Sequence, residues 1–235
     1  MEVLMYIFLN SFIFGNHIPE YKFYNLVLDK DKEYFFGIDV SHYQGNIDWK
    51  NIQYEQDSLS FVFVRATMGT NRRDSLFLKN FKQAKSKDFV TGAYHYYDPN
   101  QRPEGQAKNF LQIISLENGD LKPVLDIEKK GKYSEKEMIS HLKIWLNIVE
   151  RELGVQPIIY SSFFFWEKYL KKDFGHYNHW LAAYSVKARL YPVTLNADAV
   201  QYADTLRVQG VSGPVDGNKI KRISFNKMII NKIKN

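Results

Sequence analysis

Long apolar runs alternate with helical segments along most of this chain, and that alternation restricts its fold more than any other feature. Near-continuous apolar runs are typical of parallel strands that are covered on both faces. Such runs lie at residues 34–40, 61–66, 90–97, 123–128 and 157–161. Apolar residues recur at helical spacing over 75–87, 104–114, 134–153 and 163–170. The pattern predicts five βα units.

The rhythm changes after the last of these helices. Three more apolar strands are predicted at 179–184, 199–202 and 215–220. A crossover between parallel strands usually contains a helix, but the proline and glycine residues of 185–198 and 204–214 leave no room for a full one. We therefore predict an α/β fold, a TIM-like, distorted (β/α)5β3 barrel with its functional residues at the carboxyl ends of the strands. An open, doubly wound sheet is the alternative, although no Gly-rich phosphate loop follows the first strand.

The two ends of the chain differ from the barrel region in composition. Residues 5–14 are apolar apart from Asn10 and Ser11, but a bilayer span needs about 20 residues. The run resembles the apolar part of a signal peptide, with Glu2 where a basic residue is expected. We predict a signal-like or membrane-tether segment at 1–33, a barrel domain at 34–225 and a basic tail at 226–235. The protein is then secreted or held in the cell envelope, either periplasmic or membrane-tethered.

Composition excludes several classes of function. The chain has no cysteine, which rules out a disulfide framework, thiolate metal sites and a cysteine nucleophile. The net charge of +6 favours anionic partners. The basic residues are scattered rather than gathered in a stripe, so we predict no nucleic-acid partner, and we expect a monomer. The densest basic patch is Lys219, Lys221, Arg222, Lys227, Lys232 and Lys234.

Two carboxylates close the fourth apolar run. Asp126 and Glu128 are two residues apart on a predicted strand, so their side chains point to the same face. A low-dielectric site that holds both separates their pKa values and leaves one acid and one anion, as glycoside hydrolysis requires. The simpler interpretation is a strand that runs into a solvated loop, where Lys129 and Lys130 neutralise the acids.

The other predicted strand ends carry further polar and aromatic side chains. Asp39 ends the first strand and Asp216 begins the last. The candidate substrate-binding residues are Tyr94, Tyr96, Tyr160, Trp180, Tyr184 and Gln201. Acids, amides and aromatic rings on one rim are typical of a sugar site.

Each of these residues also has a structural explanation. Asp39 fits a turn or helix cap, Asp216 a hairpin turn, and Trp180 a packed core. His42 and His95 lack metal-ligand spacing, so we predict no metal and no organic cofactor.

Several motifs, in order, resemble the lysozymes of glycoside hydrolase family 25. The segment 37–49, GIDVSHYQGNIDW, is similar to the opening strand of that family. The resemblance continues through FVFVRAT at 61–67, TGAYHY at 91–96, PVLDIE at 123–128, QYAD at 201–204 and VSGPVDGN at 211–218. It covers most of the predicted barrel.

The resemblance implies a barrel of five βα units and three further strands. It also implies cleavage of the β-1,4 bond between N-acetylmuramic acid and N-acetylglucosamine in peptidoglycan. By motif, Glu128 is the general acid, and Asp126 stabilises developing charge or orients the acetamido group of the substrate. Asp39 and Asp216 complete the acidic floor. A covalent and a substrate-assisted intermediate both remain open.

Three positions depart from the family pattern. Met68 stands where a Glu is common, Val200 replaces a Trp, and Gly217 replaces a bulky apolar residue. The last two are expected to loosen packing near the site. They keep two alternatives open, a catalytically weakened glycan-binding protein on the same barrel and a hydrolase for another polysaccharide.

Overall fold

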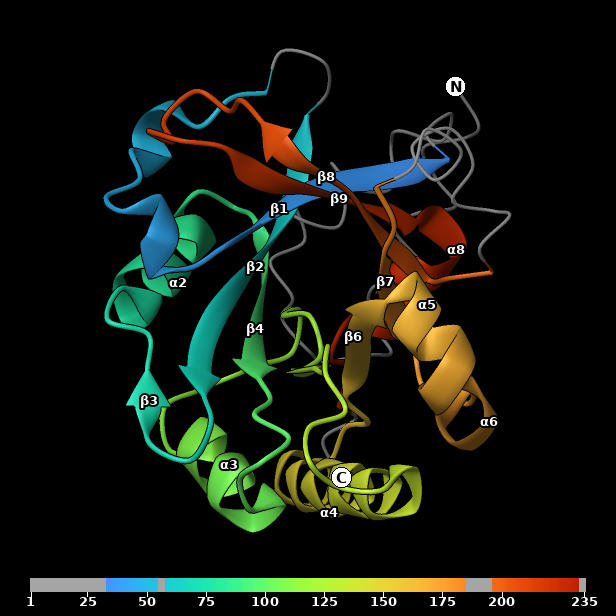
Figure 1. The fold of residues 1–235 in the computed structure, drawn as a ribbon. Helices are drawn as coiled ribbons and strands as arrows, with labels where there is room; N and C mark the ends of the chain where they lie inside the picture. Colours follow the sequence, from blue (N-terminus) through green and yellow to red (C-terminus); the bar gives the residue numbers. More distant parts are fainter. Residues whose placement is uncertain (1–32, 55–57, 185–195, 233–235) are drawn as a thin grey trace, which may run out of the picture. The chain divides into compact units, whose positions relative to one another are not determined.

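In the computed structural model, which describes residues 33–54, 58–184 and 196–232, eight strands close into a barrel (Figure 1). The strands are β1 Tyr34–Val40, β2 Leu59–Met68, β4 Val90–Tyr96, β5 Val124–Asp126, β6 Ile158–Ser162, β7 His179–Ala182, β8 Ala199–Leu206 and β9 Val215–Lys221. The barrel closes because β1 pairs with both β2 and β9. This confirms the α/β barrel and excludes the open sheet.

The last strand distorts the barrel. The seven strands from β1 to β8 that form the barrel wall pair in parallel, whereas β9 runs antiparallel to both β8 and β1. The start of β9 therefore lies at the rim where the parallel strands end. In that register Asp216 is the direct partner of Asp39.

Helices cover the outside of the barrel (Figure 1). They are α2 Phe77–Ser86, α3 Pro103–Leu111, α4 Glu135–Leu153, the continuous series α5 Phe163–Phe165, η3 Trp166–Leu170 and α6 Lys171–Phe174, and α8 Arg222–Met228. Short 3-10 turns occur at η1 His42–Gln44 and η2 Trp49–Asn51. The predicted helix at 163–170 thus continues four residues further.

Two elements did not follow from the sequence pattern. Strand β3, Arg72–Arg73, folds back antiparallel on the end of β2. Helix α8 crosses the boundary that we placed after residue 225; its last residue, Met228, is buried, and so is Ile230 beyond it. Residues 185–195 of the predicted connection, and the N-terminal segment up to residue 32, lie outside the described residues. Within the described part of the chain, no helix is both long and apolar enough to cross a membrane.

His95 joins the barrel to its helical layer. Its ring is fully buried, stacks on Trp145 at 5.6 Å between centroids, and contacts Thr67 Oγ1 at 2.7 Å and Gln106 Oε1 at 3.2 Å. Burial lowers the pKa of His95 to about 4, so the ring is neutral. His95 therefore serves packing between β4, β2, α3 and α4.

The capping box at the start of α4 should make a measurable contribution to the stability of the protein. Ser134 Oγ accepts from the backbone N–H of Glu137 at 3.3 Å, and the Glu137 carboxylate accepts from the Ser134 N–H at 2.9 Å. We expect Ser134→Ala to lower the free energy of unfolding by about 1 kcal/mol in urea titrations. Ser86→Ala, at the exposed end of α2, is the control and should change it by less; equal effects would contradict the cap.

Candidate active site

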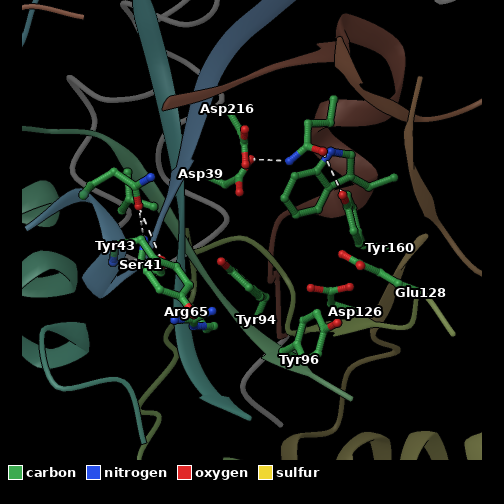
Figure 2. A pocket seen from close by; sticks show the side chains of 14 residues that line it. Asp39, Ser41, Tyr43, Arg65, Tyr94, Tyr96, Asp126, Glu128, Tyr160 and Asp216 are labelled. Carbon is green, nitrogen blue, oxygen red and sulfur yellow. Dashed lines mark hydrogen bonds between the residues drawn. The ribbon is translucent and has the colours of Figure 1, made fainter. Parts of the chain in front are cut away.

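One cavity opens at the rim where the parallel strands end, and Figure 2 shows the side chains that line it. Nine of the ten predicted site residues are among them: Asp39, Tyr94, Tyr96, Asp126, Glu128, Tyr160, Trp180, Gln201 and Asp216. The tenth, Tyr184, does not line the cavity, but its hydroxyl donates to Gln201 Oε1 at 2.5 Å.

Asp39 is the centre of the cavity floor. Its Oδ2 accepts from Gln201 Nε2 and from Asn218 Nδ2, both at 2.8 Å. Gln201 in turn accepts from the Tyr160 hydroxyl at 2.7 Å, and Asn218 accepts from Trp180 Nε1 at 3.0 Å. Side chains of β1, β6, β7, β8 and β9 are thereby joined in one hydrogen-bonded network, which fixes the floor.

Asp39 and Asp216 form a coupled pair of carboxyls. Burial, and then the charge of Asp216, raise the pKa of Asp39 well above its usual range. Burial and the charge of Asp204 raise the pKa of Asp216 to about 6. Because each carboxyl acts on the pKa of the other, ionising both together is costly, and we expect the pair to share one proton.

Asp126 and Glu128 differ in their access to solvent. Asp126, at the end of β5, is 5% exposed, and its Oδ1 has no hydrogen-bond partner among the described residues. Burial, then the charges of Glu128 and Asp39, raise its pKa well above the usual range, and Arg65 opposes this.

Glu128 follows the strand and is exposed at the cavity rim. Partial burial raises its pKa, while the charge of Lys129 and a hydrogen bond from Tyr96 oppose the shift. The site therefore combines an accessible carboxyl that can hold a proton with a buried one that lacks a donor.

The aromatic side chains at the cavity differ in what they can offer a ligand. Burial, followed by the charge of Glu128, raises the pKa of Tyr96 to about 12, so its hydroxyl stays a donor. Trp180 is only 2% exposed and stacks on Phe63 at 4.5 Å between centroids. Its ring thus packs beneath the cavity and offers no face on which a sugar could stack.

Arg65 and Tyr43 also line the cavity, and our sequence-based list of site residues omitted both. Tyr43 is 78% exposed, and the Arg65 guanidinium carbon lies 4.9 Å from its ring centroid. The sequence did carry a signal for Arg65, because it is the one charged residue in the otherwise apolar run 61–66. Among the described residues, no group of three or more His, Asp or Glu side chains could hold a metal ion.

Two departures from the family pattern are packed rather than loose. Val200 is fully buried in the core. A Cβ at Gly217 would lie 2.3 Å from Leu206 Cδ1, so the Leu206 side chain already fills that space. The expectation of loosened packing is therefore wrong at these positions. Met68 ends β2 and pairs with Arg72 of β3.

Comparisons with known proteins identify relatives of this chain. The family model of the glycosyl hydrolases family 25 matches residues 38–211. The uncharacterized protein YegX of Escherichia coli K12 is 36% identical over 190 residues, covering 77% of this chain and 68% of that protein. Lysozyme M1 of Streptomyces globisporus is 32% identical over 201 residues, covering 78% and 66%. The crystal structure of the bacterial lysozyme from Streptomyces coelicolor gives a TM-score of 0.69 at 30% identity, covering 79% of this chain and 91% of that one.

Proposed function

We propose, since this chain belongs to the glycosyl hydrolases of family 25, that it is a muramidase. Its substrate would be the β-1,4 linkage between N-acetylmuramic acid and N-acetylglucosamine in bacterial peptidoglycan. Its relatives from Streptomyces globisporus and Streptomyces coelicolor are lysozymes. The observation that carries the proposal is the pairing of buried Asp126 with accessible Glu128 in one open cavity.

Glu128 is the proposed general acid. Its position at the cavity rim gives a glycosidic oxygen access to the carboxyl, and its raised pKa favours the protonated form that donation needs. Glu128 gives its proton to the leaving oxygen as the bond to the anomeric carbon breaks, and the carboxylate then takes a proton from the incoming water. The Tyr96 hydroxyl, which donates to Glu128, orients the carboxyl.

Asp126 is the proposed partner of the reacting sugar. Its buried Oδ1 lacks a donor in the described structure, and the N–H of a substrate acetamido group is a donor of the right kind. In that role Asp126 orients the acetamido group and, when ionised, stabilises positive charge at the anomeric carbon. Asp39 and Asp216 form the floor beneath it.

The proposed substrate sets the expected partner and compartment. Peptidoglycan is an anionic polymer, which suits a chain of net charge +6. A muramidase acts outside the cytoplasmic membrane, so we propose that the protein is secreted or held in the cell envelope, and acts as a monomer.

The proposal predicts the chemistry of the ends that the protein creates. Purified protein should clear a suspension of peptidoglycan and release reducing ends, and borohydride reduction of the products should yield muramitol. Glucosaminitol in its place would contradict a muramidase. Binding to peptidoglycan without new reducing ends would support the glycan-binding alternative, and cleavage of chitin alone would support a different polysaccharide.

A further inference from the structure

The acidic cavity has one cationic wall. Among the described residues that line it, Arg65 is the only cation, and four carboxyls line the same cavity. Figure 2 shows Tyr43 and Arg65 together on one side of the cavity, with Glu128 and Tyr160 on the opposite side. A glycan that is bound at Glu128 and crosses the cavity therefore passes Arg65.

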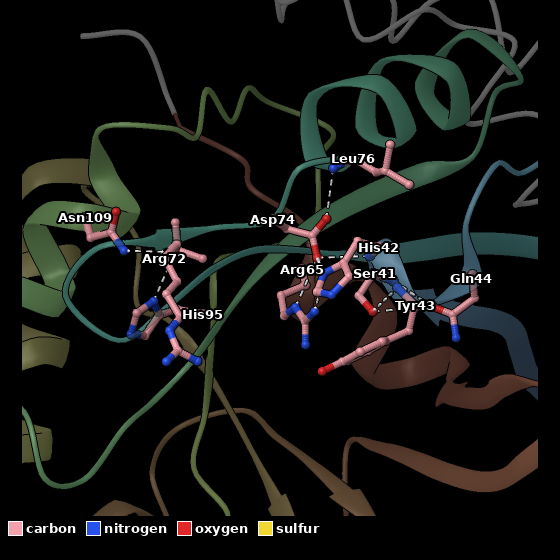
Figure 3. A network of polar contacts seen from close by, with 11 residues as sticks. Ser41, His42, Tyr43, Gln44, Arg65, Arg72, Asp74, Leu76, His95 and Asn109 are labelled. Atoms are coloured by element: carbon pink, nitrogen blue, oxygen red, sulfur yellow. Dashed lines mark hydrogen bonds and ion pairs between the residues drawn. The ribbon is translucent and has the colours of Figure 1, made fainter.

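A buried carboxylate holds Arg65 in place (Figure 3). The Asp74 side chain is 1% exposed, and its Oδ2 accepts from Arg65 Nε at 3.1 Å and from the backbone N–H of His42 at 3.0 Å. Its Oδ1 accepts from the backbone N–H of Leu76 at 3.1 Å. His42 Nδ1 lies 2.7 Å from Arg65 Nη2. These contacts tie η1, β2 and the start of α2 around one guanidinium.

The same contacts hold an exposed aromatic ring against the cation at the mouth of the cavity. Arg65 lies beneath the ring of Tyr43, and the His42 ring lies 4.3 Å from that ring between centroids. The Arg65 side chain is 11% exposed, whereas Tyr43 is 78% exposed. We call this pair the Tyr43–Arg65 shelf.

The shelf has donors to spare. A guanidinium carries five N–H groups in a fork that matches a carboxylate. Asp74 engages Nε, and His42 Nδ1, which lies 2.9 Å from Asp74 Oδ2 and 2.7 Å from Arg65 Nη2, engages at most one hydrogen of Nη2. Donors therefore remain on both Nη atoms. If Arg65 only balanced the charge of the acids, it would need neither the buried Asp74 carboxylate to hold it nor the exposed Tyr43 ring over its guanidinium.

We propose that the Tyr43–Arg65 shelf is a subsite for the sugar that carries a carboxylate, with Arg65 donating to that carboxylate and the Tyr43 ring packing on the sugar. The inference rests on the proposed function, because muramic acid and its stem peptide supply such groups within peptidoglycan. The carboxylate belongs either to the lactyl group or to the stem peptide. In both cases the shelf makes the enzyme selective for muramic acid over neutral glucosamine polymers.

The test pairs variants of the shelf with substrates that differ in charge. The substrates are glycan strands with stem peptides, strands freed of peptide so that only lactyl carboxylates remain, and both after carbodiimide amidation of the carboxyls. Arg65→Met should raise KM about 10-fold or more on the carboxylate substrates and leave KM on the amidated ones unchanged. Arg65→Lys should restore part of the loss. A rise in KM on peptide-free strands identifies the lactyl group as the source of the carboxylate. A rise only on strands with stem peptides identifies the peptide.

A matched control separates the subsite from net charge. Arg151→Met removes an equally charged residue at the exposed end of α4, and it should leave KM unchanged on every substrate. Asp74 keeps its donors from His42 and Leu76 in Arg65→Met, so the fold should persist, and thermal unfolding checks this. Equal losses on charged and amidated substrates, or no loss on either, would overturn the subsite.

Failure of the subsite and failure of the proposed function give different results. The Glu128→Gln protein, titrated calorimetrically with the same charged and amidated strands, reports selectivity for carboxylates without catalysis. A wild-type protein that releases no reducing ends would remove the muramidase proposal alone. Equal affinity of Glu128→Gln for charged and amidated strands would remove the shelf alone.

Discussion

Glu128→Gln should reduce the rate of peptidoglycan cleavage by about 10²- to 10⁴-fold, the usual contribution of general acid–base catalysis. Glutamine keeps the shape of the side chain and its place at the cavity rim, but it cannot release a proton to the leaving oxygen. The loss should appear in kcat, because the proton moves only in the transition state. Counting reducing ends over time on purified peptidoglycan measures it.

The wild-type pH profile adds a second check on the same residue. Partial burial raises the pKa of Glu128, so the alkaline limb of kcat should fall at a pH above the pKa of a free glutamate, about 4.3. Glu152→Gln is the matched control, because Glu152 is exposed and pairs only with its neighbour Arg151 in the described structure. Full activity in Glu128→Gln would exclude Glu128 as the acid.

The positions of the acids could be predicted because they depend on local pattern and one rule of topology. Apolar runs mark the strands, and the carboxyl ends of parallel strands meet at one rim. Asp39, Asp126 and Glu128 follow directly. Asp216 reaches the same rim for a different reason, since β9 runs antiparallel and presents its first residues there. A strand joined by loops alone carries no signal for its direction.

The cationic wall could not be predicted in the same way. Arg65 reaches the cavity in a fixed orientation because it contacts Asp74 and His42, which lie 9 and 23 residues away from it in the sequence. Such contacts depend on how β3 and η1 fold back onto the barrel, and the spacing of apolar residues in the sequence does not predict this. Tyr184 differs from the other predicted residues, since it follows a strand end but does not line the cavity, and its hydroxyl reaches the lining only through Gln201.

Asp39→Asn should stabilise the protein at neutral pH while lowering its activity. The folded state raises the pKa of Asp39 through burial and the charge of Asp216. It therefore binds the Asp39 proton more tightly than the unfolded chain does. The stabilisation is complete below the pKa of a free aspartate, about 4, and is lost as pH rises through the raised pKa. The wild-type protein at pH 7 therefore lacks part of the stability that it has at low pH, whereas an uncharged amide at the same position keeps it at every pH.

Asparagine mimics the protonated aspartic acid at this position. Its Oδ1 can accept from Gln201 and Asn218, as Asp39 Oδ2 does, and its amide can donate to Asp216. We expect the free energy of unfolding at pH 7 to rise by about 2 kcal/mol, with little change at pH 4. Unfolding temperature should rise by about 4–8 °C for a domain of this size. Activity should fall, because costly acidic clusters are kept for function.

Asp74→Asn provides the control of opposite sign. The Asp74 side chain is also buried, and burial by itself raises its pKa. Hydrogen bonds from His42 and Leu76 and the charge of Arg65 outweigh burial, so the pKa of Asp74 is lowered. Its stabilisation is present above the pKa of a free aspartate and is lost as pH falls through the lowered pKa. Asp74→Asn should therefore destabilise the protein at pH 7. If both variants are destabilised at pH 7, Asp39 is a conventional structural carboxylate, and the shared-proton pair at the cavity floor does not exist.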